Sequence, residues 1–136
     1  MDTRHKTYNS VKMKKRTQER LFTPVIGRVA VLNEYVLRKR GKAKKVVQYN
    51  YIDDMVKQCF LLFKYAMRQL SGKDYVKRSV ELCEEIQCSA YLIARLGGFT
   101  AEECARIDVS VDEILDEISN AAKSQEGQNH HTKNDE

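Results

Sequence analysis

The chain has 136 residues, a formal net charge of +5 and 32% charged residues. That length suits one small domain, and no stretch approaches the roughly 18 apolar residues of a membrane-spanning helix, so a transmembrane helix is excluded. The basic N-terminus also lacks the apolar run of a signal peptide, and we therefore expect a cytoplasmic protein.

The charge is strongly segregated along the sequence. Residues 1–45 hold fourteen Lys and Arg against three Asp and Glu, a surplus of +11. Residues 46–78 have a surplus of +3, and residues 79–136 have a net charge of −9. A basic half followed by an acidic half favours a surface that binds polyanions, or subunits that pair head to tail, or both.

The first element in chain order is a basic segment without hydrophobic periodicity. Residues 1–15 are polar and basic, so we expect a flexible arm there. A first helix is predicted to begin between Arg16 and Pro24, because Thr followed by Pro is a common helix start, and to end near Arg40, just before Gly41. Its apolar positions recur at steps of three and four residues: Phe22, Val25, Val29, Leu32 and Val36.

A second helix is predicted from Val47 or Tyr51 to Leu70. Its apolar seam, again at steps of three and four, consists of Ile52, Val56, Cys59, Phe63, Ala66 and Leu70. Phe60 and Leu61 extend the apolar surface beyond this seam. We therefore predict a second buried contact on this helix, for example between subunits.

The third helix is predicted from Asp74 to Leu96. Ser71 and Asp74 have the spacing of a capping box, and Gly97 and Gly98 end the helix. Its predicted inward stripe is Tyr75, Leu82, Ile86, Ser89, Ile93 and Leu96, with Val80, Cys83, Ala90 and Ala94 beside it.

Thr100 and Glu103 form the clearest helix start in the chain, a Thr-x-x-Glu capping box. The fourth helix is predicted to run to about Lys123. Its inward positions are Cys104, Ile107, Val111, Ile114, Ile118 and Ala121. Residues 124–136 have the composition of a disordered tail.

Four amphipathic helices joined by short loops predict an all-α protein, an antiparallel up-down four-helix bundle. The predicted division is a flexible basic arm over residues 1–15, the bundle over residues 16–123 and a disordered tail over residues 124–136.

Catalytic and metal chemistry find little support in the sequence. The four cysteines form no C-x-x-C pair; they are Cys59, Cys83, Cys88 and Cys104. The three histidines all lie outside the predicted helices; they are His5, His130 and His131. We expect the thiols to pack as small hydrophobic groups and expect no metal, no cofactor and no enzymatic activity. The acidic residues of the last two helices have the spacing of a solvated face: Glu81, Glu84, Glu85, Glu102, Glu103, Asp112, Glu113, Asp116 and Glu117.

The basic residues favour binding of RNA or DNA, because each neutralised phosphate releases a counterion. The candidate residues are Lys12, Lys14, Lys15, Arg16, Arg20, Arg28, Arg38, Lys39, Arg40, Lys42, Lys44 and Lys45. The stretch from Arg38 to Lys45 is expected to dominate. Tyr8, Tyr35, Tyr49 and Tyr51 lie near these clusters and could stack on unpaired bases, although packing in the bundle is equally expected for Tyr35 and Tyr51.

Several strings in the second half of the chain carry a family resemblance. They are Lys73-Asp74-Tyr75-Val76, the run from Tyr91 to Glu103 (YLIARLGGFTAEE) and Asp112-Glu113-Ile114. From about Ile52 to Lys123 the chain resembles a four-helix-bundle family. That family includes the accessory variability determinant (Avd) proteins of diversity-generating retroelements and the proteins encoded within intervening sequences of bacterial 23S rRNA genes.

Resemblance to the Avd branch implies a homopentameric, barrel-like assembly with a positively charged surface. It also implies partnership with a reverse transcriptase that copies template-repeat RNA during mutagenic retrohoming. The strong basic bias favours this branch. The alternative is a structural or interaction oligomer of the intervening-sequence type, without a nucleic-acid role, whose basic and acidic faces attract each other between subunits.

Overall fold

In the computed structural model of the protein, the backbone is described for residues 2–134 and the side chains for residues 20–124. The long helices are α1 (Asp2–Arg40), α3 (Asp53–Leu70), α4 (Val76–Arg95) and α5 (Ala101–Asn134). A short helix α2 (Lys45–Val47) and one π-helical turn η1 (Gln48–Ile52) lead into α3. Within the described backbone there is no strand, so the prediction of an all-helical chain with four long helices is confirmed.

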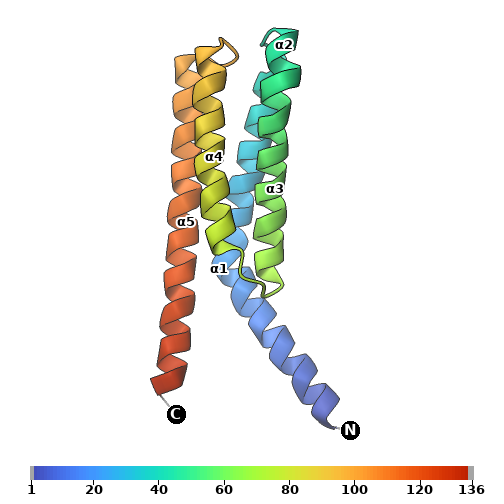
Figure 1. The fold of residues 1–136 in the computed structure, drawn as a ribbon. Helices are drawn as coiled ribbons and strands as arrows, with labels where there is room; N and C mark the ends of the chain where they lie inside the picture. The colour runs from blue at the N-terminus through green and yellow to red at the C-terminus, as the bar shows by residue number, and fades with distance from the viewer. Residues whose placement is uncertain (1, 135–136) are drawn as a thin grey trace.

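The long helices form a four-helix bundle (Figure 1). Helix α1 packs against α3 and α5, and α4 packs against the same two helices on the other side. In Figure 1 the connections from α1 to α2 and from α4 to α5 lie at one end of the bundle, and the connection from α3 to α4 lies at the other end. Residues that are distant in sequence therefore meet at each end.

The predicted helix limits agree with the structure at several ends. Helices α1 and α3 end at Arg40 and Leu70, as predicted, and α4 ends at Arg95, one residue early. Pro24 lies inside α1 and not at its first turn. Helix α1 begins at Asp2 and not between Arg16 and Pro24, so its predicted start is wrong. The described backbone of residues 2–15 belongs to α1 and that of residues 124–134 to α5, so the predicted flexible arm (1–15) and disordered tail (124–136) are not confirmed.

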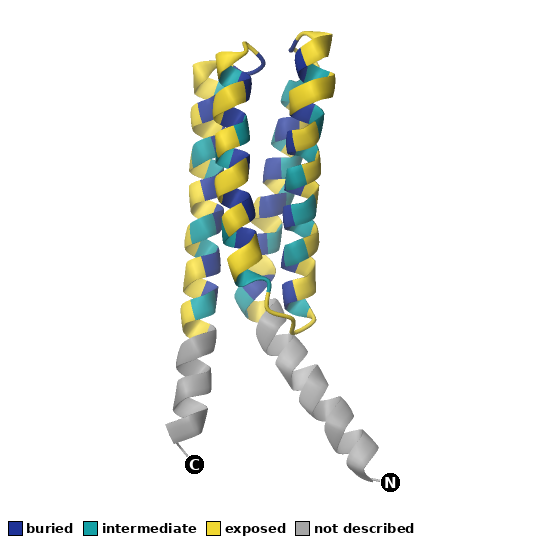
Figure 2. Ribbon diagram, in the orientation of Figure 1, coloured by how far each residue is buried: buried dark blue, intermediate teal, exposed yellow. Residues whose placement is uncertain are grey.

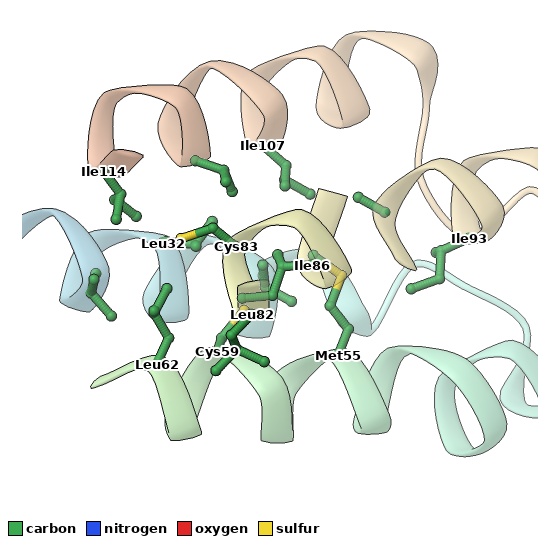
Figure 3. Close-up of a cluster of buried hydrophobic side chains, with 14 of the residues drawn as sticks. Leu32, Met55, Cys59, Leu62, Leu82, Cys83, Ile86, Ile93, Ile107 and Ile114 are labelled. Carbon is green, nitrogen blue, oxygen red and sulfur yellow. The ribbon is translucent and has the colours of Figure 1, made fainter. Parts of the chain in front are cut away.

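Burial follows the predicted stripes of the first and fourth helices at every position, and the buried residues lie along the inward faces in Figure 2. Figure 3 shows side chains of all four long helices pointing toward one another, among them Leu32, Leu62, Ile86 and Ile114. One contiguous apolar core therefore holds the bundle together.

The predicted seam of α3 is correct in part. Ile52, Cys59 and Ala66 are buried, but Met55 and Leu62 are fully buried where Val56 and Phe63 were predicted. Both predicted residues are only half-buried, as is Leu70. Val56 stays partly open because it lines a groove between α1 and α3, described below.

On α4, three residues of the predicted stripe are not buried. Leu96 is exposed because α4 ends before it, and Tyr75 and Ser89 are half-buried. The Ser89 hydroxyl donates to Gln58 Oε1 at 2.9 Å. The inward face of α4 instead holds Ser79, Leu82, Cys83, Ile86, Ala90 and Ile93.

The capping box at the start of α5 is confirmed. The Thr100 N–H donates to Glu103 Oε1 at 2.9 Å, and the Glu103 N–H donates to Thr100 Oγ1 at 3.1 Å. These two bonds satisfy backbone donors that a helix start leaves without partners.

The capping box predicted at Ser71 is wrong. The Ser71 hydroxyl donates to the Arg68 carbonyl at 2.7 Å, and Asp74 Oδ1 accepts the Val76 N–H at 3.2 Å. Because α4 begins only at Val76, Asp74 and not Ser71 lies close enough to cap its first turn. The buried Gln69, at the end of α3, is hydrogen-bonded across the same turn: its side-chain Oε1 accepts a hydrogen bond from the Tyr75 N–H at 2.6 Å.

The cysteine side chains differ in environment. Cys59, Cys83 and Cys104 are buried and Cys88 is exposed. Burial raises the thiol pKa of Cys59 and of Cys83 to about 12.

None of the helices in the described part of the chain is long and apolar enough to cross a bilayer.

We expect the buried thiols to contribute to stability and the exposed thiol not to. Cys59→Ser or Cys83→Ser places a hydroxyl in the apolar core and should lower the free energy of unfolding by about 1–3 kcal/mol. Cys88→Ser should change it by less than about 0.5 kcal/mol. Urea denaturation measures both, and at about pH 8 a thiol reagent should label Cys88 first. A Cys83→Ser variant as stable as Cys88→Ser would contradict this packing.

We also expect Thr100→Ala to lower the free energy of unfolding by about 1 kcal/mol, because the cap is lost. Ser71→Ala is the matched control and should stay within about 0.5 kcal/mol of the wild type.

The hydrogen bond from the Thr100 backbone N–H lowers the pKa of the Glu103 carboxyl. A depressed carboxyl pKa stabilises the fold at neutral pH, and this contribution is lost as the pH falls. The stability gap between wild type and Glu103→Gln should therefore stay constant from neutral pH down to about pH 5 and close as the pH falls further, through the lowered pKa of Glu103. A gap that stays constant in acid would contradict this contribution.

Candidate nucleic-acid interface

The densest group of cations lies where α1 ends and the chain turns into α2. We call residues 38–45 the basic corner; it contains Arg38, Lys39, Arg40, Lys42, Lys44 and Lys45. It occupies the end of the bundle at which α4 also connects to α5 (Figure 1).

Buried apolar anchors hold the basic corner in place. Ala43 and Val47 are buried, and the Gln48 side-chain amide donates to the Ala43 carbonyl at 2.6 Å. Val47 also contacts the α4–α5 turn at Gly98, where an added Cβ would lie 2.7 Å from Val47 Cγ1. A side chain at position 98 would therefore push the two turns apart. With the apolar positions committed to the core, the cations between them face solvent.

Two cations of the basic corner are paired with acids on other helices. Arg40 Nε and Nη2 donate to the two carboxylate oxygens of Asp53 at 2.5 and 3.1 Å. This bond raises the pKa of Arg40 and lowers the pKa of Asp53. Lys39 Nζ lies 3.7 Å from Glu103 Oε2 on α5. These pairs tie α1 to its neighbours, and they leave less charge for a ligand.

The other four cations of the basic corner are available. Arg38, Lys42, Lys44 and Lys45 are exposed, and none of them has a carboxylate oxygen within 4.0 Å among the described side chains. Four exposed cations on a short, anchored segment can neutralise several adjacent phosphates, which is the requirement for salt-sensitive binding of nucleic acid.

Helix α5 adds a cation that the sequence analysis missed. The ring centroid of Tyr35 lies 5.3 Å from Arg106 Cζ, 5.5 Å from Lys39 Nζ and 5.9 Å from Arg38 Cζ. Arg106 is one of four cations in the acidic half of the sequence, and only the packing of α1 on α5 brings it beside the basic corner. Its one signal in the sequence is its place just before the core residue Ile107.

Tyr35 itself is half-buried, and this burial is the main cause that raises its pKa. With three cations already around the ring, the arrangement supports the packing alternative for Tyr35 over base stacking.

The remaining predicted cations fall into separate groups. Arg28 is turned toward α5, where Nη1 lies 2.7 Å from Glu113 Oε2 and Nε lies 3.3 Å from Glu117 Oε1. Arg20 is exposed on α1, well before the basic corner in the sequence. The side chains of Lys12, Lys14, Lys15 and Arg16, and of Tyr8, lie outside the described residues.

A second surface, between α1 and α3, is apolar. A groove of about 640 Å³ is lined by Asn33, Glu34, Leu37, Val56, Lys57, Phe60, Leu61 and Lys64. Leu37 and Phe60 are 60% and 53% exposed. Lys64 Nζ lies 4.5 Å from the centroid of the Phe60 ring, and Asn33 donates to the Cys59 carbonyl at 3.0 Å at the base of the groove. We call this surface the apolar groove.

In the described part of the chain, His, Cys, Asp and Glu side chains form no group that could hold a metal ion. Comparison of the chain with protein-family models, with curated proteins and with solved structures found no match. Any assignment of function therefore depends on the surfaces described above.

Proposed function

We propose that the protein is a non-catalytic nucleic-acid-binding accessory protein that acts as a homo-oligomer. The observation that carries the proposal is the basic corner, where four exposed cations lie on one anchored turn with no carboxylate oxygen within 4.0 Å among the described side chains. Such a site binds the phosphate backbone with little dependence on sequence, so RNA and DNA are both ligands.

Resemblance to Avd proteins extends the proposal to a partner. The strings that carry the resemblance form the start of α4, the α4–α5 turn with its capping box, and part of α5. On this basis we propose an Avd-like partner of a reverse transcriptase in a diversity-generating retroelement, with an up-down antiparallel bundle as subunit and a homopentamer as assembly. Co-purification of a reverse transcriptase with the chain, from its native source, tests the partner.

The oligomer is supported by a separate observation, the apolar groove. Leu37 and Phe60 in this groove are more than half exposed, and contact of apolar side chains with water is unfavourable. Exposed apolar patches commonly mark protein–protein contacts. The surplus of apolar residues on the second predicted helix led us to expect a subunit contact, and we propose the apolar groove as its place.

Replacing Lys42, Lys44 and Lys45 together by Gln should weaken binding of RNA and of DNA. It should also reduce the slope of log affinity against log salt by about 0.7–0.9 for each phosphate contact removed. The fold should be unchanged, because all three side chains are exposed. Fluorescence anisotropy over a series of salt concentrations measures both quantities.

The matched control replaces Lys73, Lys77 and Lys123 by Gln. These three exposed lysines lie toward the other end of the bundle, so the charge change is the same at a different place. Deletion of residues 1–15 measures the contribution of the predicted arm. A folded triple variant with unchanged affinity and salt slope would refute the basic corner as the binding site, and absence of binding by the wild type at low salt would favour the purely structural oligomer.

Phe60→Ser should reduce the molar mass measured by light scattering at micromolar concentration, because it removes apolar surface from the groove. Val31→Ser is the control, since Val31 is 58% exposed but lies outside the groove lining. A wild-type protein that is monomeric, or a Phe60→Ser variant with the wild-type mass, would contradict a subunit contact at the groove.

A further inference from the structure

The turn that follows the basic corner is wider than an α-helical turn. In η1 the Asp53 N–H donates to the Gln48 carbonyl, five residues earlier, which defines a π-helical turn. Such turns are rare and occur frequently at functional sites. Ile52 stays fully buried at the end of η1, while Tyr49 is 60% exposed, so the turn keeps the core closed and presents an aromatic ring to solvent.

The exposed ring of Tyr49 lies next to a fixed cation. Arg40 Cζ is 5.3 Å from the Tyr49 ring centroid, a favourable cation–π distance. Arg40 is in turn held by two hydrogen bonds to Asp53, four residues after Tyr49. The guanidinium and the ring are therefore positioned before any ligand arrives, which lowers the entropy lost on binding.

Exposed lysines precede Tyr49 closely in the sequence. Lys45 precedes Tyr49 by four residues of continuous helical backbone, a spacing that places two side chains on the same side of a helix. Lys44 and Lys42 are exposed in the turn just before it. Tyr51, two residues after Tyr49, points away from this side.

We propose that Tyr49, backed by Arg40, is a stacking site for an unpaired base, with Lys45 and Lys44 binding the adjacent phosphates. The protein then prefers single-stranded RNA or DNA to duplex. This inference rests on the proposed nucleic-acid-binding function and adds the class of strand that the basic corner takes. The physical reason is that bases in a duplex are already stacked on their neighbours, whereas an unpaired base can place its face on an aromatic ring.

The test compares unstructured single-stranded RNA and DNA oligonucleotides with a DNA duplex of the same length. Fluorescence anisotropy measures each affinity over a series of salt concentrations that begins at low salt. Wild type should bind the single strands more tightly. Tyr49→Leu should lose about fivefold to a hundredfold in affinity for single strands and little for duplex. Tyr49→Phe and Tyr49→Trp, which keep an aromatic face, should retain the wild-type preference.

Tyr91→Leu is the matched control, because Tyr91 is 64% exposed on α4 and receives the same substitution. It should bind like the wild type. Stacking and charge are separated by the salt slope, which Tyr49→Leu should leave unchanged and the lysine triple variant should reduce. Circular dichroism confirms that each variant is folded.

Each outcome bears on one proposal. Equal affinity of the wild type for single strands and duplex, or a folded Tyr49→Leu that binds single strands as well as Tyr91→Leu does, overturns the stacking site and leaves nucleic-acid binding in place. Absence of binding to every oligonucleotide overturns the proposed function itself.

Discussion

The reversal of the chain between α1 and α3 depends on burying Ala43 and Val47, and Val47 packs against the turn between α4 and α5. Gly98 makes this contact possible, because a Cβ at that position would overlap Val47 on one side and lie 2.6 Å from Ile93 Cγ2 on the other. Once these apolar groups are committed to the core, the lysines between and beside them have no place except in solvent. The exposed charge of the basic corner is thus a consequence of how the end of the bundle is packed.

The acidic helices decide which cations remain available. Glu113 and Glu117 take up Arg28 in the middle of the bundle, Glu103 lies beside Lys39, and Asp53 binds Arg40. Exposed ion pairs of this kind contribute little to stability. Their larger effect is on the distribution of charge, because they pair Arg28, Lys39 and Arg40. The cations left unpaired are Arg38, in the last turn of α1 where the helix dipole also favours positive charge, and the lysines of the turn that follows.

The basic corner and the apolar groove adjoin each other on α1. Leu37 lines the groove and Arg38 begins the corner, so a subunit contact at the groove would bring other subunits close to the proposed phosphate-binding site. Several corners held in one assembly would raise the effective concentration of cations along a single strand, and weak individual contacts would then give stable binding. Oligomer and nucleic-acid interface support each other in this arrangement.

The sequence by itself determined the features that depend on neighbours a few residues apart. The steps of three and four residues identified the inward faces of α1 and α5, and Thr100 with Glu103 identified the start of α5, because helical periodicity and capping are local. The tertiary structure decided which flank of α3 is buried, that Ser71 does not cap α4, and that Arg106 joins the cations around Tyr35. It also decided that Arg28 and Arg40 are neutralised while Lys44 and Lys45 are not. Those outcomes depend on which helices lie side by side, and a pattern read along one helix carries no information about the charge or shape of its neighbour.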